Sequence, residues 1–269
     1  MKKLIVTGDD FGLSLPLNDA IEEAHRRGIL NTASLMVGAE ATADAVDRAS
    51  QLPSLHVGLH LVLVEGSPVL PPQALSDLLN RHGEFSSHLV RAGINFFLRP
   101  KVRRQLEAEI RAQFQAFRDT GLPLDHVNTH HHMHLHPTVL GLILKAGREY
   151  GMRAIRLPYE PPLLSWRASR NGLLWRTGTW LLLSPWVSSL KRRLRRTRVH
   201  SNDFVFGMND SGHIHLDLIL RFLKFLPQGV TEIYFHPGDN TNELEALTNP
   251  VMRQALLSSQ IQTISFSDL

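Results

Sequence analysis

The chain has 269 residues, of which 43% are hydrophobic and 20% charged, a composition typical of a soluble globular protein with a sizeable core. It contains no cysteine, which excludes disulfides, thiolate zinc sites and cysteine nucleophiles and fits a reducing compartment. The apolar run after the two N-terminal lysines is too short for a signal peptide, and no stretch of about 18 uncharged apolar residues is present to span a membrane, so we expect a cytoplasmic protein.

In the first half of the chain, short apolar runs predict strands, and amphipathic spacing predicts helices between them. The strands are expected at residues 2–8, 32–37, 55–61 and 124–129. The helices are expected at residues 16–28, 39–50, 102–117 and 138–150.

The second half continues the alternation. Strands are expected at 152–157, 203–206, 231–236 and 261–266, with helices at 214–226 and 242–258. Strands that alternate with helices form parallel βαβ units. Seven or eight such units in a chain of this length predict an α/β fold of the TIM-like (β/α) barrel kind, with a doubly wound open sheet as the alternative.

The segment from Pro161 to Asn202 differs in composition from the rest of the chain. It contains no Asp or Glu, all four Trp, and nine of the 29 Lys and Arg, so the remainder carries 20 basic against 25 acidic residues. We therefore expect an insertion of about residues 161–202 in a single domain of residues 1–269. Trp and Arg interleaved with apolar runs suit a membrane interface, whereas a helical lid packed on the barrel is the alternative, and one segment can serve as both. We expect the segment to cover the mouth of the barrel and to bring the protein to a membrane surface.

Polar side chains lie at the C-terminal ends of five predicted strands. They are Asp9, Asp10, His60, His130, Arg156 and His236. In a (β/α) barrel these strand ends meet at one rim, where active sites are built. Residues from opposite ends of the chain are therefore expected to share one pocket, which Arg156 should face.

One Asp with two His forms a typical site for a catalytic divalent metal, and a second carboxylate and a further histidine can then act as general base and general acid. Taken singly, these motifs have ordinary explanations, because "GDDFG" can be a turn and His60 can be a core histidine. In "THHHMHLHP" five histidines occupy seven positions, too many for one ion. His131 is expected to point away from His130, and His136 to open the following helix.

A resemblance to a known family rests on several separated motifs. "VTGDDFGLS", "ASLMV", "HVGLHLVLVEGSP", "HVNTHHHMHLHPTV" and "YFHPG" occur in this order, and over nearly its whole length the chain resembles the YdjC or chitooligosaccharide deacetylase family. The resemblance implies a distorted (β/α) barrel. It also implies that acetyl groups are removed from N-acetylated amino sugars with the help of a divalent metal.

Carried over to this sequence, the resemblance implies one zinc or magnesium ion with Asp10, His60 and His130 as its ligands. Asp9 is implied as the base, a role that rests also on likeness to the wider polysaccharide deacetylases, and His236 as the acid. We assign Arg156 and His132 to substrate contact. Many members carry Asp two residues before the first ligand histidine, where this chain has Asn128, which supplies no negative charge.

A closer resemblance involves "GLPLDHVN", "GREYGMRAIRLPYEPP", the Trp and Arg segment and "NDFVFGMNDSGHI". These stretches resemble the deacetylases associated with hopanoid biosynthesis. The implied substrate is an N-acetylglucosaminyl group on a polycyclic lipid, and the implied location is peripheral, at the inner face of the membrane. A homo-oligomer is compatible with the sequence. No nucleic-acid motif accompanies the basic segment, so nucleic acid is not expected as a partner.

Two other classes of function stay open. Another metal-dependent barrel hydrolase, such as a phosphoesterase or amidohydrolase, commonly places an HxH pair on its first strand, whereas this chain has Asp9 and Asp10 there. A non-catalytic lipid- or metal-binding protein needs neither a base nor an acid, yet Asp9 and His236 are both present.

Overall fold

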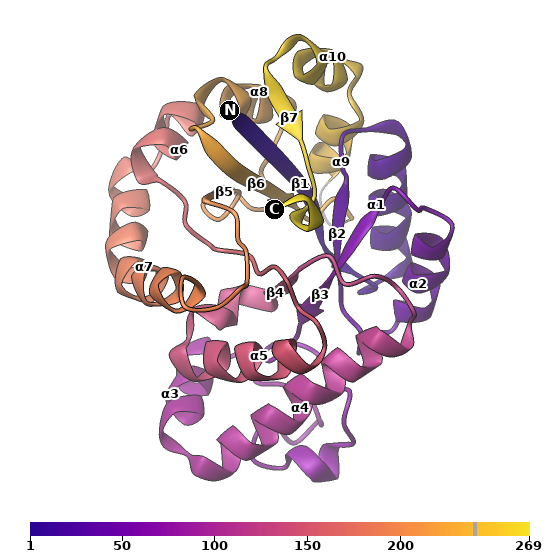
Figure 1. Ribbon diagram of the computed structural model, residues 1–269, viewed down its shortest axis with the longest axis vertical. Helices are drawn as coiled ribbons and strands as arrows, with labels where there is room; N and C mark the ends of the chain where they lie inside the picture. Colours follow the sequence, from indigo (N-terminus) through magenta and orange to yellow (C-terminus); the bar gives the residue numbers. More distant parts are fainter. Residues whose placement is uncertain (239–240) are drawn as a thin grey trace.

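A curled parallel sheet forms the centre of the molecule in the computed structural model, which describes residues 1–238 and 241–269 (Figure 1). Its strands lie in the order β4-β3-β2-β1-β6-β5, and β7 pairs with the start of β1. Their bounds are β1 (Lys2–Phe11), β2 (Thr32–Leu35), β3 (His56–Leu61), β4 (Val127–Thr129), β5 (Phe204–Phe206), β6 (Gly229–Phe235) and β7 (Ile261–Thr263). The predicted TIM-like α/β fold is confirmed, in the form of a distorted barrel.

The two edges of the sheet are joined by an irregular stretch rather than by a strand. Between β4 and β5 the chain makes only isolated contacts, in which the amide of Arg156 donates to Val127 O and that of Ile155 to His200 O, both at 3.0 Å. The prediction of a full strand at 152–157 was therefore wrong. The neighbouring strands are only three residues long, which leaves little ladder for it to join.

Helices surround the sheet on its outer side (Figure 1). They are α1 (Leu15–Arg27), α2 (Thr42–Ser50), α3 (Leu89–Leu98), α4 (Pro100–Asp119), α5 (Pro137–Glu149), α6 (Pro162–Ser169), α7 (Leu173–Leu194), α8 (Leu216–Phe225), α9 (Thr241–Thr248) and α10 (Pro250–Ser258). Three 3₁₀ turns complete the elements, η1 (Pro72–Leu75), η2 (His130–Leu135) and η3 (Phe266–Asp268).

Two of these helices replace the one expected over 242–258. Pro250 has no amide hydrogen to continue the first helix, and it restricts the residue before it to extended conformations. Asn249 is accordingly extended, and its side chain accepts from the amide of Val251 to cap α10. Helix α3 was not predicted.

The core lies between the helices and the sheet, and β1 runs through its middle. Leu4, Ile5 and Val6 are all fully buried, as expected for a parallel strand covered on both faces. Helices α6 and α7, from the Trp- and Arg-rich stretch, extend the outer ring between α5 and α8, with α6 packed on α8 and α7 on α5 (Figure 1).

Candidate metal centre and active site

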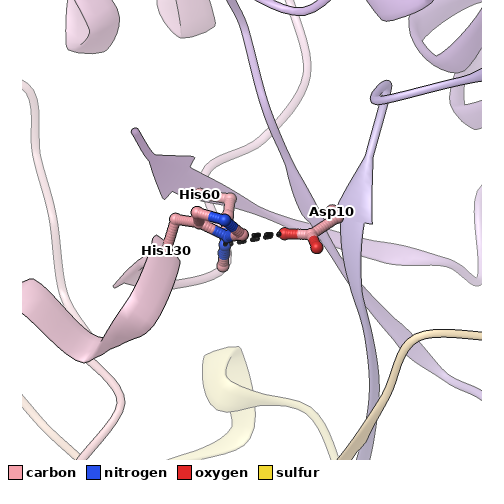
Figure 2. A group of neighbouring side chains, drawn as sticks. All are labelled: Asp10, His60 and His130. Carbon is pink, nitrogen blue, oxygen red and sulfur yellow. Dashed lines mark hydrogen bonds and ion pairs between the residues drawn. The ribbon is translucent and has the colours of Figure 1, made fainter. Parts of the chain in front are cut away.

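Three side chains from different strands meet at the C-terminal end of the barrel. Oδ1 of Asp10, at the end of β1, lies 3.0 Å from Nε2 of His60 on β3 and 3.2 Å from Nδ1 of His130, which follows β4. The two ring nitrogens are 3.4 Å apart. Figure 2 shows both rings directed at the Asp10 carboxylate. One carboxylate oxygen and two imidazole nitrogens at this spacing form a group that could hold a metal ion.

The backbone at these strand ends is unusual. The pairing of β1 with β2 is irregular between Gly8 and Phe11, and Asp10 has a left-handed φ of 62°. His131 and His132, directly after His130, are also left-handed, with φ of 52° and 53°. Such conformations cost free energy in residues with a Cβ and concentrate at functional sites.

Asn128 fixes the orientation of the His60 ring. His60 Nδ1 donates to Asn128 Oδ1 at 2.6 Å, which leaves Nε2 facing Asp10. The amide nitrogen of Asn128 donates to Asp9 Oδ1 at 3.2 Å and to Ser34 Oγ at 2.9 Å. An aspartate at position 128 could accept from His60 but would oppose the Asp9 carboxylate, so the asparagine orients the ring without adding charge.

Asp9 is held by a fully buried arginine. Arg156 donates to both Asp9 oxygens, at 2.6 and 2.9 Å, and also to both oxygens of Glu232, at 2.7 and 2.8 Å. Burial alone would raise the pKa of the Asp9 carboxyl, but the guanidinium, helped by nearby histidines, brings this pKa well below its usual range. Asp9 is therefore ionised at neutral pH.

The place of Arg156 corrects one expectation. Its side chain has no exposed surface and is not among the residues that line the pocket. Direct contact with substrate, which we expected for it, is not available in this structure, and Arg156 contacts Asp9 from beneath the pocket.

His236 follows β6 on the other side of the cluster. Its Nε2 lies 3.8 Å from Asp10 Oδ2, and its Nδ1 lies 3.1 Å from Ser211 Oγ. The backbone amide of His236 donates to the buried Glu243 at 2.7 Å. These contacts at Nδ1 and at the amide direct Nε2 toward the pocket.

The remaining histidines of the 130–136 stretch have separate surroundings. His132 lines the pocket with Nε2 3.3 Å from the Tyr234 hydroxyl, and burial holds its pKa well below the ordinary value. His134 is buried between Thr129 Oγ1 and the Arg156 carbonyl. His131 pairs with Glu65 at 2.6 Å, but its ring centroid lies only 4.2 Å from that of His130 and it lines the pocket, so it does not point away as expected. His136 precedes α5 as expected.

The pocket above the cluster has a volume of about 550 Å³. Its described lining includes Asp9, His60, the three consecutive histidines 130–132, Tyr234 and His236, together with Leu89 of α3 and residues 208, 211 and 212 after β5. None of these residues belongs to 161–202. The lining of the pocket therefore does not support the expectation that this segment covers its mouth. Besides the residues at the strand ends, the pocket is lined by Leu89 of α3 and by the loop after β5.

Several residues of the site escaped sequence analysis. Glu232 lies inside the apolar run "TEIYFH", where a charged residue in a buried strand is itself a signal for an internal ion pair. Tyr234 comes two residues after Glu232 on β6, so its side chain points to the same face of the strand. Ser211 and Glu243 carry no such signal. Ser211 lies in the loop after β5, and Glu243 lies in helix α9, where the sequence does not indicate that a glutamate is buried.

Comparison with known proteins agrees with this geometry. The sequence model of a family described as YdjC-like protein matches residues 3–258. A carbohydrate deacetylase of Brevibacillus brevis is 33% identical over 270 residues, covering 99% of each chain. A carbohydrate deacetylase of Vibrio campbellii is 28% identical over 283 residues, covering 99% of this chain and 96% of its own. A solved structure from Enterococcus faecalis V583 shares the fold, with a TM-score of 0.76 at 22% identity over 99% of this chain and 98% of its own.

Proposed function

The chain belongs to the YdjC-like protein family, and we propose that it is a metal-dependent carbohydrate deacetylase that hydrolyses the acetamide of an N-acetylated amino sugar. The observation that carries the proposal is the pocket in which the Asp10, His60 and His130 donor group lies beside the ionised Asp9. The carbohydrate deacetylases of Brevibacillus and Vibrio support it, since they align with this chain over almost its full length.

The residues present fit a divalent ion. Asp10, His60 and His130 would hold it, since a carboxylate oxygen and two imidazole nitrogens are common ligands of zinc, and Asn128 already presents the free Nε2 of His60. The ion would supply Lewis acidity, which polarises the acetyl carbonyl and lowers the pKa of the attacking water. Zinc fits the N₂O set best, and magnesium is the alternative.

Asp9 and His236 divide the proton transfers in this proposal. Asp9, ionised and lining the pocket, takes a proton from the attacking water. His236, on the opposite side of Asp10, gives a proton to the departing amine nitrogen. Arg156 keeps Asp9 ionised and oriented, and neutral His132 offers a hydrogen bond to the sugar from the pocket wall.

Acetate release from an N-acetylated amino sugar tests this function. We expect release that is abolished by a chelator and restored by zinc or magnesium, and Asp9→Asn and His236→Ala should lose about 10²–10⁴-fold in rate while keeping the metal. Turnover of a phosphoester instead of an acetamide would identify the second class of barrel hydrolase. Metal binding without any turnover would identify a binding protein.

We further propose that the natural substrate is an N-acetylglucosaminyl group on a polycyclic lipid and that 161–202 is an insertion into a single deacetylase unit of 1–269. The outer face of α7 supports contact with a lipid surface. Leu174, Trp175 and Leu182 are 88%, 73% and 72% exposed, and helical spacing places the exposed Arg192 in line with Leu174. Arg195, directly after α7, is also exposed.

An apolar stripe that ends in basic groups suits the interface of an anionic membrane, where each basic residue contributes about 1 kcal/mol. Contact would be peripheral, and in the described chain no helix combines the length and apolar character needed to cross a bilayer. Leu181→Glu with Leu182→Glu should abolish binding to phosphatidylglycerol vesicles and leave turnover of a soluble N-acetylated sugar unchanged. Equal vesicle binding by this variant and the original chain would refute membrane contact.

A further inference from the structure

A second hollow lies at the opposite end of the barrel from the metal cluster. Its volume is about 650 Å³, and its walls are the end of α5, the turn that follows it, and the stretch between α7 and β5. Arg153 and His200 lie side by side in it, since the amide of His200 donates to Arg153 O at 2.8 Å. Both precede the residues that close the barrel, whereas the metal cluster follows the strands, and the two hollows share no lining residue.

This hollow is strongly basic. Arg148, Arg153, Arg196 and Arg198 line it together with His200, and its described lining includes no carboxylate. None of the four guanidinium groups has a hydrogen-bond or ion-pair partner within residues 1–238 and 241–269.

Nearby acidic groups form no ion pair with these arginines in the described chain, although Asp125 lines an adjoining hollow that shares Arg153 and His200 with this one. Glu149, the neighbour of Arg148 in sequence, is turned to the other side of α5, where Arg111 of α4 donates to it at 2.8 Å. Arg48, by contrast, is paired with Asp44 and Glu22. Four unpaired guanidinium groups around one concavity raise the local positive potential, which an anion would neutralise.

The chemistry of the walls indicates the kind of anion. Guanidinium groups bind phosphate through paired hydrogen bonds, and several of them around one site favour a phosphate monoester or diphosphate over a single carboxylate. Leu144, Met152 and Val199 provide an apolar side to the same hollow.

We propose that this hollow binds a phosphorylated ligand, with the phosphate held by Arg148, Arg153, Arg196 and Arg198 and the carbon skeleton against Leu144, Met152 and Val199. The site is separate from deacetylation and does not depend on it. A soluble phosphorylated metabolite and a phospholipid headgroup share this chemistry.

Calorimetric titration of the full chain distinguishes the two sources. Glucose 6-phosphate represents a soluble phosphomonoester, and dihexanoyl phosphatidic acid, used below its micelle concentration, represents a headgroup free of any membrane. We expect saturable binding at one site for at least one of them. Binding of the sugar phosphate alone identifies a soluble ligand, of the lipid alone a headgroup, and of both a site that recognises the phosphate itself.

A matched pair of variants separates the hollow from general electrostatic attraction. Arg153→Gln with Arg198→Gln removes two charges from the hollow, and Lys101→Gln with Arg104→Gln removes two exposed charges of α4 that do not line it. We expect binding to weaken at least about tenfold in the first variant and to stay within about twofold in the second, with both retaining the circular dichroism spectrum of the fold. Absence of saturable binding, or equal weakening in both variants, would overturn the proposal.

Discussion

Two buried arginines hold two carboxylates each, and their surroundings differ in a way that explains their roles. Arg156 lies beneath the pocket between Asp9 of β1 and Glu232 of β6. Arg176, on α7, lies between Glu160 and Asp210 and is 2% exposed. Both connect segments that are far apart in sequence.

The geometry of the bonds differs between the two arginines. Arg156 donates twice to each of its carboxylates, at 2.6 to 2.9 Å. Arg176 donates twice to Asp210, at 2.6 and 2.9 Å, but only once to Glu160, at 3.1 Å. Burial and the negative charge of Asp210 raise the pKa of Glu160 against its bonds from the Asn209 amide and Arg176. Paired bonds from an arginine thus lower the pKa of buried Asp9, whereas one long bond leaves the pKa of Glu160 raised.

The two arrangements therefore serve different ends. Arg156 sustains a negative charge at Asp9, which opens onto the pocket. Arg176 attaches α7 to the rim, since Asp210 directly precedes Ser211, the partner of His236. We therefore expect a change of Arg156 to alter the rate of deacetylation and its pH profile. A change of Arg176 should mainly alter the free energy of unfolding.

The largest effect is expected for Arg156→Met. Removing one partner of a buried ion pair costs about 3–5 kcal/mol in the free energy of unfolding. The pKa of Asp9 should rise, because burial is then opposed mainly by the nearby histidines, so the acid limb of the deacetylation profile should move to higher pH and the rate should fall about 10²–10⁴-fold. Denaturant unfolding and a pH–rate profile measure the two effects. An unchanged acid limb would contradict the role given to Arg156.

Arg176→Met should destabilise the chain by a similar amount, about 3 kcal/mol, because it leaves Asp210 buried without its partner. Deacetylation of a soluble substrate, corrected for the folded fraction, should stay within about tenfold, and its pH profile should keep its shape. A shifted acid limb in this variant would contradict the separate roles that we give to Arg156 and Arg176.

Acid should destabilise the chain through His134, which bonds to the carbonyl of Arg156. His134 stays neutral in the folded chain down to low pH, because burial, followed by the charge of Arg156, lowers its pKa to about 3. In the unfolded chain it takes up a proton near pH 6.5. Its contribution to the free energy of unfolding is therefore fully present above pH 6.5 and is lost as the pH falls toward 3. The loss is about 1.4 kcal/mol per pH unit.

Urea unfolding between pH 7 and 5, with a chelator present to exclude metal release, measures this dependence. His134→Gln should lower stability at pH 7, since it loses a bond to Thr129 or to the Arg156 carbonyl, but should flatten the slope with pH. The same slope in the variant would assign the titration to another group.

The smallest effect is expected for Glu160→Gln. Since burial already raises the pKa of Glu160, a neutral amide of the same shape should cost about 1 kcal/mol or less. Asp210→Asn, which removes the ionised partner of Arg176, should cost distinctly more. Equal losses of unfolding free energy in the two variants would mean that both carboxylates carry the same charge.

The sequence predicts the strand ends of this site well because an apolar run followed by Asp or His marks the rim of a parallel barrel. It places Arg156 at the correct end of the barrel but not at the correct depth, because the backbone there forms only isolated bridges instead of the regular strand that was predicted. Helix α3 was missed, since "VRAGINFFL" leaves Val90, Ile94 and Phe97 exposed and so lacks the usual separation of polar and apolar faces. The role of Asn128 depends on three partners from other strands, which no local pattern contains.

The closure between β4 and β5 lies between the two edges of the sheet, and His130 follows the edge strand β4. Only isolated hydrogen bonds bridge the gap, so amide hydrogens there should exchange with solvent sooner than those of β1. Asp10 and His236 instead end β1 and follow β6, which pair directly from Lys2 to Gly8. Widening the seam therefore moves His130 and leaves the distance from His236 to Asp10 largely unchanged. On heating, ion retention should fail at a lower temperature than the alignment of His236 with Asp10.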